Sequence, residues 1–248
     1  HIADDHLSER ARKAVNEILG GESLTIASTW ADEMRSSSFK AEFWGYDYAA
    51  SWHFVNINEN LTYAESEKSA QGDAYLALRT FESILKNEAF GENSIKDGLL
   101  YYFGTLDGED NQLQLRQFAL RFLIHIVADL HQPLHVGKEA DQGGNNISVN
   151  WFGRSSNLHT VWDSRLVEFL ANDYLEISNK ISRKVNLLTS AEMVEIQQAS
   201  PLDWINEGLI LRVQVYDVDR YNSSFADAYA LEFSAVIENQ MQKAGLRL

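Results

Sequence analysis

The sequence predicts a mostly α-helical protein, and three observations carry that prediction. The chain has 248 residues but only 2 Pro and 14 Gly, so few residues interrupt regular structure. Apolar residues recur at three- and four-residue spacing in several segments, whereas a single segment alternates like a strand. Hydrophobic residues make up 45% and charged residues 23%, which is typical of a globular protein. We expect one domain over residues 1–248, with at most a small β element.

The first expected helices follow from apolar stripes. One stripe ends at Gly20-Gly21, a pair that favours a helix stop. The members of this stripe are Ala11, Val15, Ile18 and Leu19. The next two stripes are Ala74, Leu78, Phe81 and Leu85, and then Leu115, Phe118 and Phe122. Each of these stripes predicts an amphipathic helix with one buried face.

The second half of the chain carries capping signals. Thr189 with Glu192 predicts a capping box, and Ser200 before Pro201 predicts an N-cap followed by a proline-started helix. The C-terminal stripe, which also predicts a helix, is Tyr229, Phe233, Val236, Ile237 and Met241. The segment 146–152 alternates apolar and polar residues and is the clearest expected strand.

Charge and cysteine content exclude several functional classes. The 36 Asp and Glu outnumber the 21 Lys and Arg, which gives a net charge of −15. A chain this acidic does not wrap an extended polyanion by charge alone, so another source of positive charge is needed if it handles phosphates. Without Cys there is no disulfide, thiolate metal site or Cys nucleophile. No apolar run reaches the roughly 18 residues of a membrane span, and the polar start shows no signal peptide.

The stripe that begins at Leu115 continues onto His125 and Asp129. A buried carboxylate is costly unless it is paired or bound to a metal. At this four-residue spacing on a helix, the Cβ atoms lie about 5–6 Å apart on one face. An imidazole nitrogen and a carboxylate so placed can bind one ion.

The same spacing recurs at His159 and Asp163. His135 lies between the two pairs, just after Pro133, which disfavours helix at the preceding residue. Upstream, Asp32 and His53 add a further carboxylate and imidazole. These seven residues are the candidate metal ligands.

The alternative for each pair is an ordinary hydrogen bond, since most buried polar groups are simply paired. Two pairs on apolar faces, a third His between them and the absence of Cys favour a metal, and nitrogen with oxygen ligands suits zinc. We expect His131 to have a packing or orienting role and His6 to be structural or solvated.

Several motifs resemble the zinc-dependent single-strand nucleases of fungi and plants, which have bacterial relatives. The matching segments, in family order, are Thr29–Arg35, Trp52–Asn56, His125–Gly137, Gly143–Asn146 and Asn157–Asp163. Weaker matches lie at Ile2–Ser8 and Trp204–Glu207, so the resemblance covers nearly the whole chain. It implies the mostly α-helical fold of bacterial zinc phospholipase C, holding three Zn²⁺ ions.

The resemblance also implies residue roles. Asp32, His53, His125 and Asp129 would hold one zinc, while His135, His159 and Asp163 would hold another. Asp129 would bridge to a third zinc. The catalytic residues would be Asp32, Asp129 and Arg35, and Arg35 would stabilise the phosphate. Phe54 would stack on a nucleobase and Asn56 would hydrogen-bond it, although the family often has Asp at the second position. Asn145 and Asn157 are the further expected substrate-binding residues.

One departure concerns the third zinc. Family members begin with a Trp whose amine and carbonyl bind that ion, and a His soon after completes the site. Here only His1 precedes Ile2, and His6 belongs to a different segment of the family pattern. Either a preceding segment carries the ligands, which is our expectation, or His1 substitutes through its amine and imidazole.

The implied activity is hydrolysis of single-stranded DNA and RNA to 5′-phosphonucleotides, with 3′-nucleotidase activity. Zinc would reverse the acidic field locally, and single strands would be preferred because a base must leave its stack to enter the site. A phospholipase C-like enzyme and a zinc-binding protein with weakened or absent catalysis are the alternatives. We also expect a secreted or periplasmic monomer that does not bind membranes.

Overall fold

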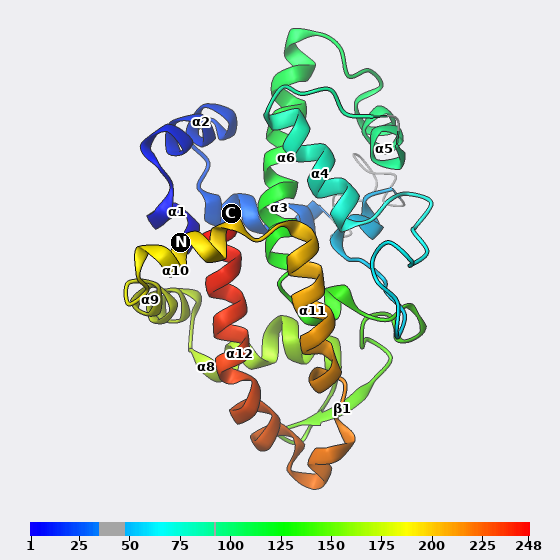
Figure 1. Cartoon of the computed structure of the whole chain (residues 1–248), viewed down its shortest axis with the longest axis vertical. Helices are drawn as coiled ribbons and strands as arrows, with labels where there is room; N and C mark the ends of the chain where they lie inside the picture. The colour runs from blue at the N-terminus through cyan, green and yellow to red at the C-terminus, as the bar shows by residue number, and fades with distance from the viewer. Residues whose placement is uncertain (35–47, 92) are drawn as a thin grey trace. The chain divides into compact units, whose positions relative to one another are not determined.

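The computed structural model describes residues 1–34, 48–91 and 93–248, and it is mostly helical with one two-stranded antiparallel sheet (Figure 1). This confirms the predicted fold class. The described chain forms two compact units. The first contains His1, Ala3–Val55 and Lys68–Asp129, and the second contains Ile2, Asn56–Glu67 and Leu130–Leu248. The expectation of a single domain over residues 1–248 stays a prediction.

The first unit is built around an aromatic core. Its elements are most of α1 (Ile2–His6), α2 (Glu9–Leu19), α3 (Leu24–Met34), the 3₁₀ helix η1 (Ala49–His53), α4 (Ala74–Leu85), α5 (Ser94–Phe103) and α6 (Glu109–Asp129). Trp52 is fully buried and meets the rings of Phe81 and Phe122 edge-on, at centroid distances of 5.8 and 5.6 Å. This core joins η1 to α4 and α6 and thereby fixes the position of His53.

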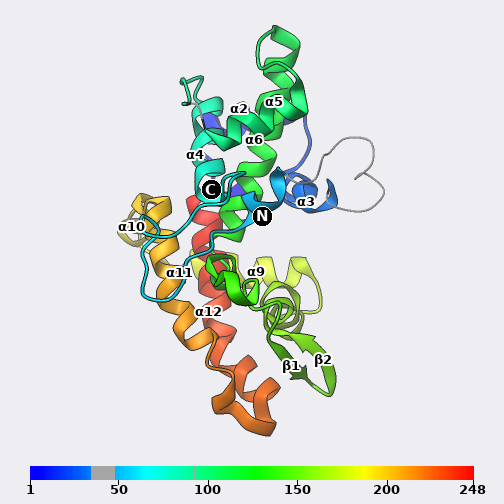
Figure 2. The ribbon, with the colours of Figure 1, turned by 90° about the vertical axis from the view of Figure 1, so that its right-hand side faces the viewer.

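The second unit contains the hairpin and the long C-terminal helices. Its elements are η2 (Pro133–Val136), η3 (Glu139–Asp141), β1 (Ser148–Trp151), β2 (Arg154–Asn157), α7 (Leu158–Thr160), the π-helical η4 (Val161–Arg165), α8 (Leu166–Leu170), α9 (Tyr174–Val185), α10 (Ser190–Gln198), α11 (Pro201–Val215), η5 (Asp219–Ser224) and α12 (Phe225–Arg247). Figure 2 shows the hairpin, in which Ser148 pairs with Asn157. The core of this unit includes Trp162, Tyr229 and Phe233.

The local sequence signals act as expected. Gly20 ends α2 in the left-handed region with φ 64°, and Thr189 and Ser200 both form capping boxes. The strand within 146–152 is shorter than the alternation indicates, since β1 covers only Ser148–Trp151. It ends there because the chain turns at Phe152 and Gly153, with positive φ at both residues. Among the described residues, no helix combines the length and apolar character that crossing a bilayer requires.

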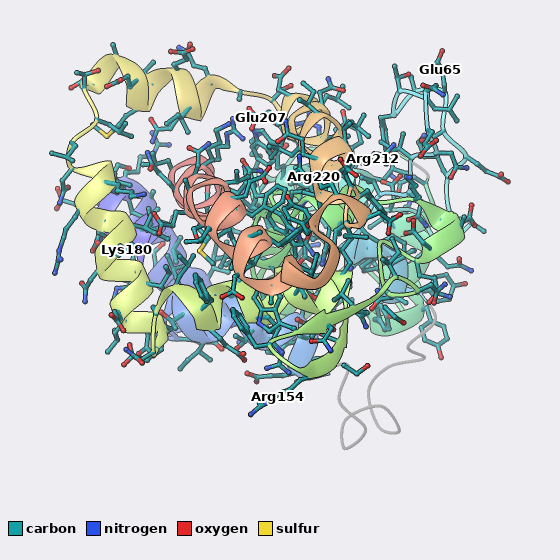
Figure 3. All side chains as sticks on the ribbon, turned by 90° about the horizontal axis from the view of Figure 1, so that it is seen from below. Glu65, Arg154, Lys180, Glu207, Arg212 and Arg220 are labelled. Carbon is teal, nitrogen blue, oxygen red and sulfur yellow. The ribbon has the colours of Figure 1, made fainter. Side chains whose placement is uncertain are left out.

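An ion-pair cluster joins α11 to α12 through Glu207, labelled in Figure 3. Glu207 accepts hydrogen bonds from Arg247 at 2.7 and 3.0 Å and from Lys243 at 2.9 Å. Burial alone raises the pKa of Glu207, but these hydrogen bonds outweigh burial and lower the pKa from 4.5 to about 2. The cluster therefore stabilises the fold fully above about pH 4.5, and loses this effect as the pH falls towards 2.

We expect Glu207→Gln to lower the free energy of unfolding by about 1–2 kcal/mol at pH 7, after allowing for solvent screening. The difference from the unsubstituted protein should shrink as the pH falls from 4.5 towards 2, because Glu207 then becomes neutral as well. Urea unfolding at several pH values measures it. If the difference in unfolding free energy between the two proteins stayed constant from pH 4.5 to 2, the low pKa of Glu207 would be contradicted.

Candidate metal-binding groups

The first group of ligand-type side chains comes from α3, η1 and α6. Atoms of Asp32, His53 and His125 lie within 4.8 Å of one another. Nε2 of His125 is 3.0 Å from Nδ1 of His53, and Oδ1 of Asp32 is 3.8 and 4.0 Å from these two nitrogens. Oδ2 of Asp129 lies 3.1 Å from each of the same nitrogens. The four predicted residues of this set therefore converge.

The donor set fits a zinc ion. Ligand atoms about 2.1 Å from a tetrahedral zinc are about 3.4 Å apart, and the distances in this group lie on both sides of that value. Two imidazole nitrogens and two carboxylate oxygens are ligands that zinc accepts. Nδ1 of His125 lies 2.7 Å from the carbonyl oxygen of Ser28. An Nδ1–H donated to that carbonyl leaves the lone pair of Nε2 directed at the group.

The charges around this group favour a cation. His53 and His125 are buried, and the side chain of Asp129 is 12% exposed. Burial lowers the pKa of His125, but the carboxylates of Asp129 and Asp32 outweigh burial and raise it to about 9. The carboxylates thus favour positive charge at the position of the imidazole, and a metal ion would compete for it with the proton.

The second group comes from η2, α7 and η4. Atoms of His135, His159 and Asp163 again lie within 4.8 Å of one another. Nε2 of His135 is 3.6 Å from Oδ1 of Asp163, and Nε2 of His159 is 3.1 Å from Oδ2. The two imidazole rings are stacked, with centroids 5.0 Å apart and planes at 21°. The predicted three-residue set is thus brought together, and its nitrogen and oxygen donors also suit zinc.

Neighbouring groups orient the second set. Nδ1 of His159 lies 2.7 Å from the carbonyl oxygen of Gly143, and Nε2 of Gln132 donates to Oδ1 of Asp163 at 2.8 Å. Burial raises the pKa of Asp163, but hydrogen bonds from His135 and His159 outweigh it and hold that pKa well below its usual range. The low pKa favours the anionic form of Asp163, which faces two imidazoles, and this arrangement of charge can attract a cation.

Sequence reasoning missed the residues that orient the ligands. Ser28 and Gly143 act through backbone carbonyls, which side-chain identity does not reveal. The sequence did indicate the backbone conformation of Gln132, because a residue that precedes a proline is disfavoured in a helix. Its extended backbone, with ψ 116°, releases its side chain towards Asp163, while its Oε1 accepts from the N–H of Leu134.

The predicted substrate-binding residues have varied surroundings. Phe54 follows η1 and is half-buried in the first unit, whereas Asn56 is half-buried in the second. Asn157 caps α7 by accepting from the N–H of Thr160 at 2.7 Å, and this places His159 at the start of the helix. Nδ2 of Asn145 donates to the carbonyl oxygen of Gln142. Their roles in substrate binding stay predictions.

Three further residues considered in the sequence analysis are His1, Arg35 and His131. His1 is exposed, and its carbonyl accepts the N–H of Asp5 at 2.9 Å. Arg35 lies outside the described residues. His131 is buried against the ring of Trp204 and its Nε2 is 2.9 Å from Arg247, so the expected packing role is what the structure has.

The chain is similar to known proteins over most or all of its length. The family described as S1/P1 Nuclease matches residues 1–248. Endonuclease 4 of Arabidopsis thaliana is 26% identical over 270 aligned residues, which cover 100% of this chain and 83% of that protein. Nuclease S1 of Aspergillus oryzae is 24% identical over 70% of this chain and 53% of its own length. Nuclease P1 of Penicillium citrinum is 27% identical over 68% and 56%. The chain therefore belongs to the S1/P1 nuclease family and is a hydrolytic nuclease.

Proposed function

We propose that this nuclease is a zinc-dependent phosphodiesterase that hydrolyses single-stranded DNA and RNA to 5′-phosphonucleotides and also acts as a 3′-nucleotidase. The observation that carries the proposal is the convergence of two nitrogen-and-oxygen ligand groups within a chain of this family. Each group places two imidazoles and at least one carboxylate around one point, which supports metal binding over ordinary pairing.

In this proposal Asp32, His53, His125 and Asp129 hold one zinc ion. The second ion is held by His135, His159 and Asp163. When bound, zinc acts as a Lewis acid that lowers the pKa of coordinated water and stabilises charge on phosphate oxygens. A third zinc shared with Asp129 needs further ligands, and the candidate within this sequence is His1, through its amine and imidazole.

The protein's own residues bind and orient the substrate. We assign base stacking to Phe54 and base hydrogen bonding to Asn56, with Asn145 and Asn157 as secondary contacts. Arg35 neutralises the phosphate. Binding over one or two nucleotides through stacking suits a chain with a net charge of −15, since the positive charge is then local. We further propose that the protein is an exported monomer that does not bind membranes.

The test of this function compares cleavage of one oligonucleotide as a single strand and as a duplex. We expect the single strand to be cut faster, because extraction of a base from the duplex costs a few kcal/mol. Phe54→Ala should lower kcat/KM on the single strand about 10-fold, through lost stacking. Phe169→Ala, which removes an exposed aromatic ring of the second unit, is the matched control and should leave the rate unchanged. Equal rates on the two substrates would contradict the proposal.

A further inference from the structure

Helix α11 presents one continuous stripe to the segment that carries His135. The stripe repeats every four residues and consists of Trp204, Gly208, Arg212 and Tyr216. The ring of Trp204 lies 5.1 Å from that of His131. A Cβ on Gly208 would lie 3.0 Å from Cγ2 of Val136, so the absent side chain lets α11 approach η2 closely. The last two members of the stripe make polar contacts with the same segment.

Arg212, which Figure 3 labels, is 6% exposed. Its guanidinium binds backbone carbonyls from two separate segments. Its Nη1 donates to the carbonyl oxygens of Val136 and Gly137, at 2.8 and 3.1 Å, on the C-terminal side of His135. The same Nη1 donates to Ile57 at 2.5 Å, and Nη2 donates to Asn58 at 3.3 Å.

A buried guanidinium is costly unless its donors are satisfied, and carbonyls of two segments satisfy this one. The N–H of Ile57 also donates to the carbonyl of Gly137 at 3.0 Å. Arg212 therefore fixes the spacing between the segment that follows Asn56 and the segment that contains His135.

Tyr216 contacts the turn that orients His159, the second imidazole of the second metal group. Its hydroxyl accepts from the N–H of Lys138 at 3.2 Å and donates to Oδ1 of Asp141 at 3.0 Å. The same Oδ1 accepts the N–H of Gly144 at 2.7 Å. This turn also places the carbonyl of Gly143 against Nδ1 of His159. Burial raises the pKa of Tyr216, which favours the protonated hydroxyl that donates this hydrogen bond.

The turn has little room for a second arrangement. A Cβ on Gly137 would lie 2.5 Å from the carbonyl oxygen of Leu134 and 2.5 Å from Cα of Gly143. Backbone packed this closely transmits a displacement rather than absorbing it. A shift at Lys138 or Asp141 therefore reaches the carbonyl that orients His159.

We propose that Arg212 and Tyr216 are positioning residues, which set the zinc affinity of the His135–His159–Asp163 group from the buried face of α11. Tyr216 acts through the turn that orients His159. Arg212 acts on the His135 segment and also on the segment that carries Asn56, and so couples metal binding to substrate binding. This inference rests on the proposed function, because it requires the group to hold zinc.

The test is competition between the full-length protein and a chromophoric chelator for zinc. Tyr216→Phe and Arg212→Met should each weaken zinc binding by the second group about 10-fold, the lower end of the effect seen when a partner of a metal-ligating side chain is removed. The group of His53 and His125 should keep its affinity. Val213→Ala is the matched control, because Val213 lies on α11 but is 72% exposed.

Kinetics at saturating zinc separate the two residues. Arg212→Met should also raise KM for a single-stranded dinucleotide about 10-fold, because its carbonyl contacts beside Asn56 are lost. Tyr216→Phe should change KM less than about twofold. Arg212→Lys keeps the positive charge but cannot span both segments, so its KM and zinc affinity should lie between those of the wild type and Arg212→Met.

Two outcomes would overturn the inference. One is wild-type zinc affinity in folded Tyr216→Phe and Arg212→Lys proteins. The other is an equal loss of affinity in both groups together with a lower melting temperature, which indicates a general structural role. Failure of the proposed function is recognised separately: His159→Ala would then leave the zinc content of the protein unchanged.

Discussion

An Asp129→Asn substitution is expected to empty the first metal group and to lower nuclease activity at least about 100-fold. Asp129 is the carboxylate that lies 3.1 Å from both imidazole nitrogens of this group. The amide keeps the size of the side chain but removes the charge that attracts a cation. Zinc content by elemental analysis and initial rates on single-stranded DNA measure the two effects.

The control for this variant is Asp227→Asn, which makes the same chemical change at an exposed position on α12. We expect it to retain full zinc content and activity. Full zinc content in Asp129→Asn itself would contradict the assignment of Asp129 as a required ligand, and loss of zinc from Asp129→Asn but not from Asp227→Asn would support it.

Removal of zinc is expected to have a large effect on both nuclease activity and the free energy of unfolding. A ligand that binds only the folded protein stabilises it by about 2.7 kcal/mol per site when its free concentration is 100 times Kd. Chelation should therefore abolish activity and lower the free energy of unfolding by at least this amount, and added zinc should restore both. The carboxylates of Asp32 and Asp129 face the imidazoles of His53 and His125, and the positive charge of the ion would stabilise both carboxylates.

Urea unfolding in chelator, in zinc and in magnesium distinguishes a specific site from general charge screening. Magnesium prefers oxygen ligands in octahedral geometry and should not replace zinc at a group with two imidazoles. Equal stability in chelator and in zinc would contradict metal binding by the folded protein.

The sequence predicted the convergence of the candidate ligands best where these residues share one element. His125 and Asp129 converge because α6 runs without interruption through both, so helical spacing was sufficient. His159 and Asp163 also converge, although the chain passes there from α7 into a π-helical turn that periodicity did not indicate. His159 and Asp163 still lie on one face despite the π-helical turn, so the four-residue spacing predicted their contact correctly.

Tertiary packing decided what the sequence could not. Spacing alone did not place Asp32 or His53 beside α6; the burial of Trp52 among Phe81 and Phe122 brings η1 there. The role of Arg212 was invisible for a similar reason, since its partners are backbone carbonyls of segments far away in the chain. The only signal in the sequence was an Arg among the apolar residues of a predicted helix.

The amount of zinc per chain, measured on purified and dialysed protein, tests the central claim most directly. We expect at least two zinc ions per wild-type chain, and one fewer after Asp163→Ala, because the second group then loses its carboxylate. A value near three would mean that the third site is also complete. No bound zinc in the wild-type protein, even after zinc is added back, would contradict the assignment of both groups as metal sites.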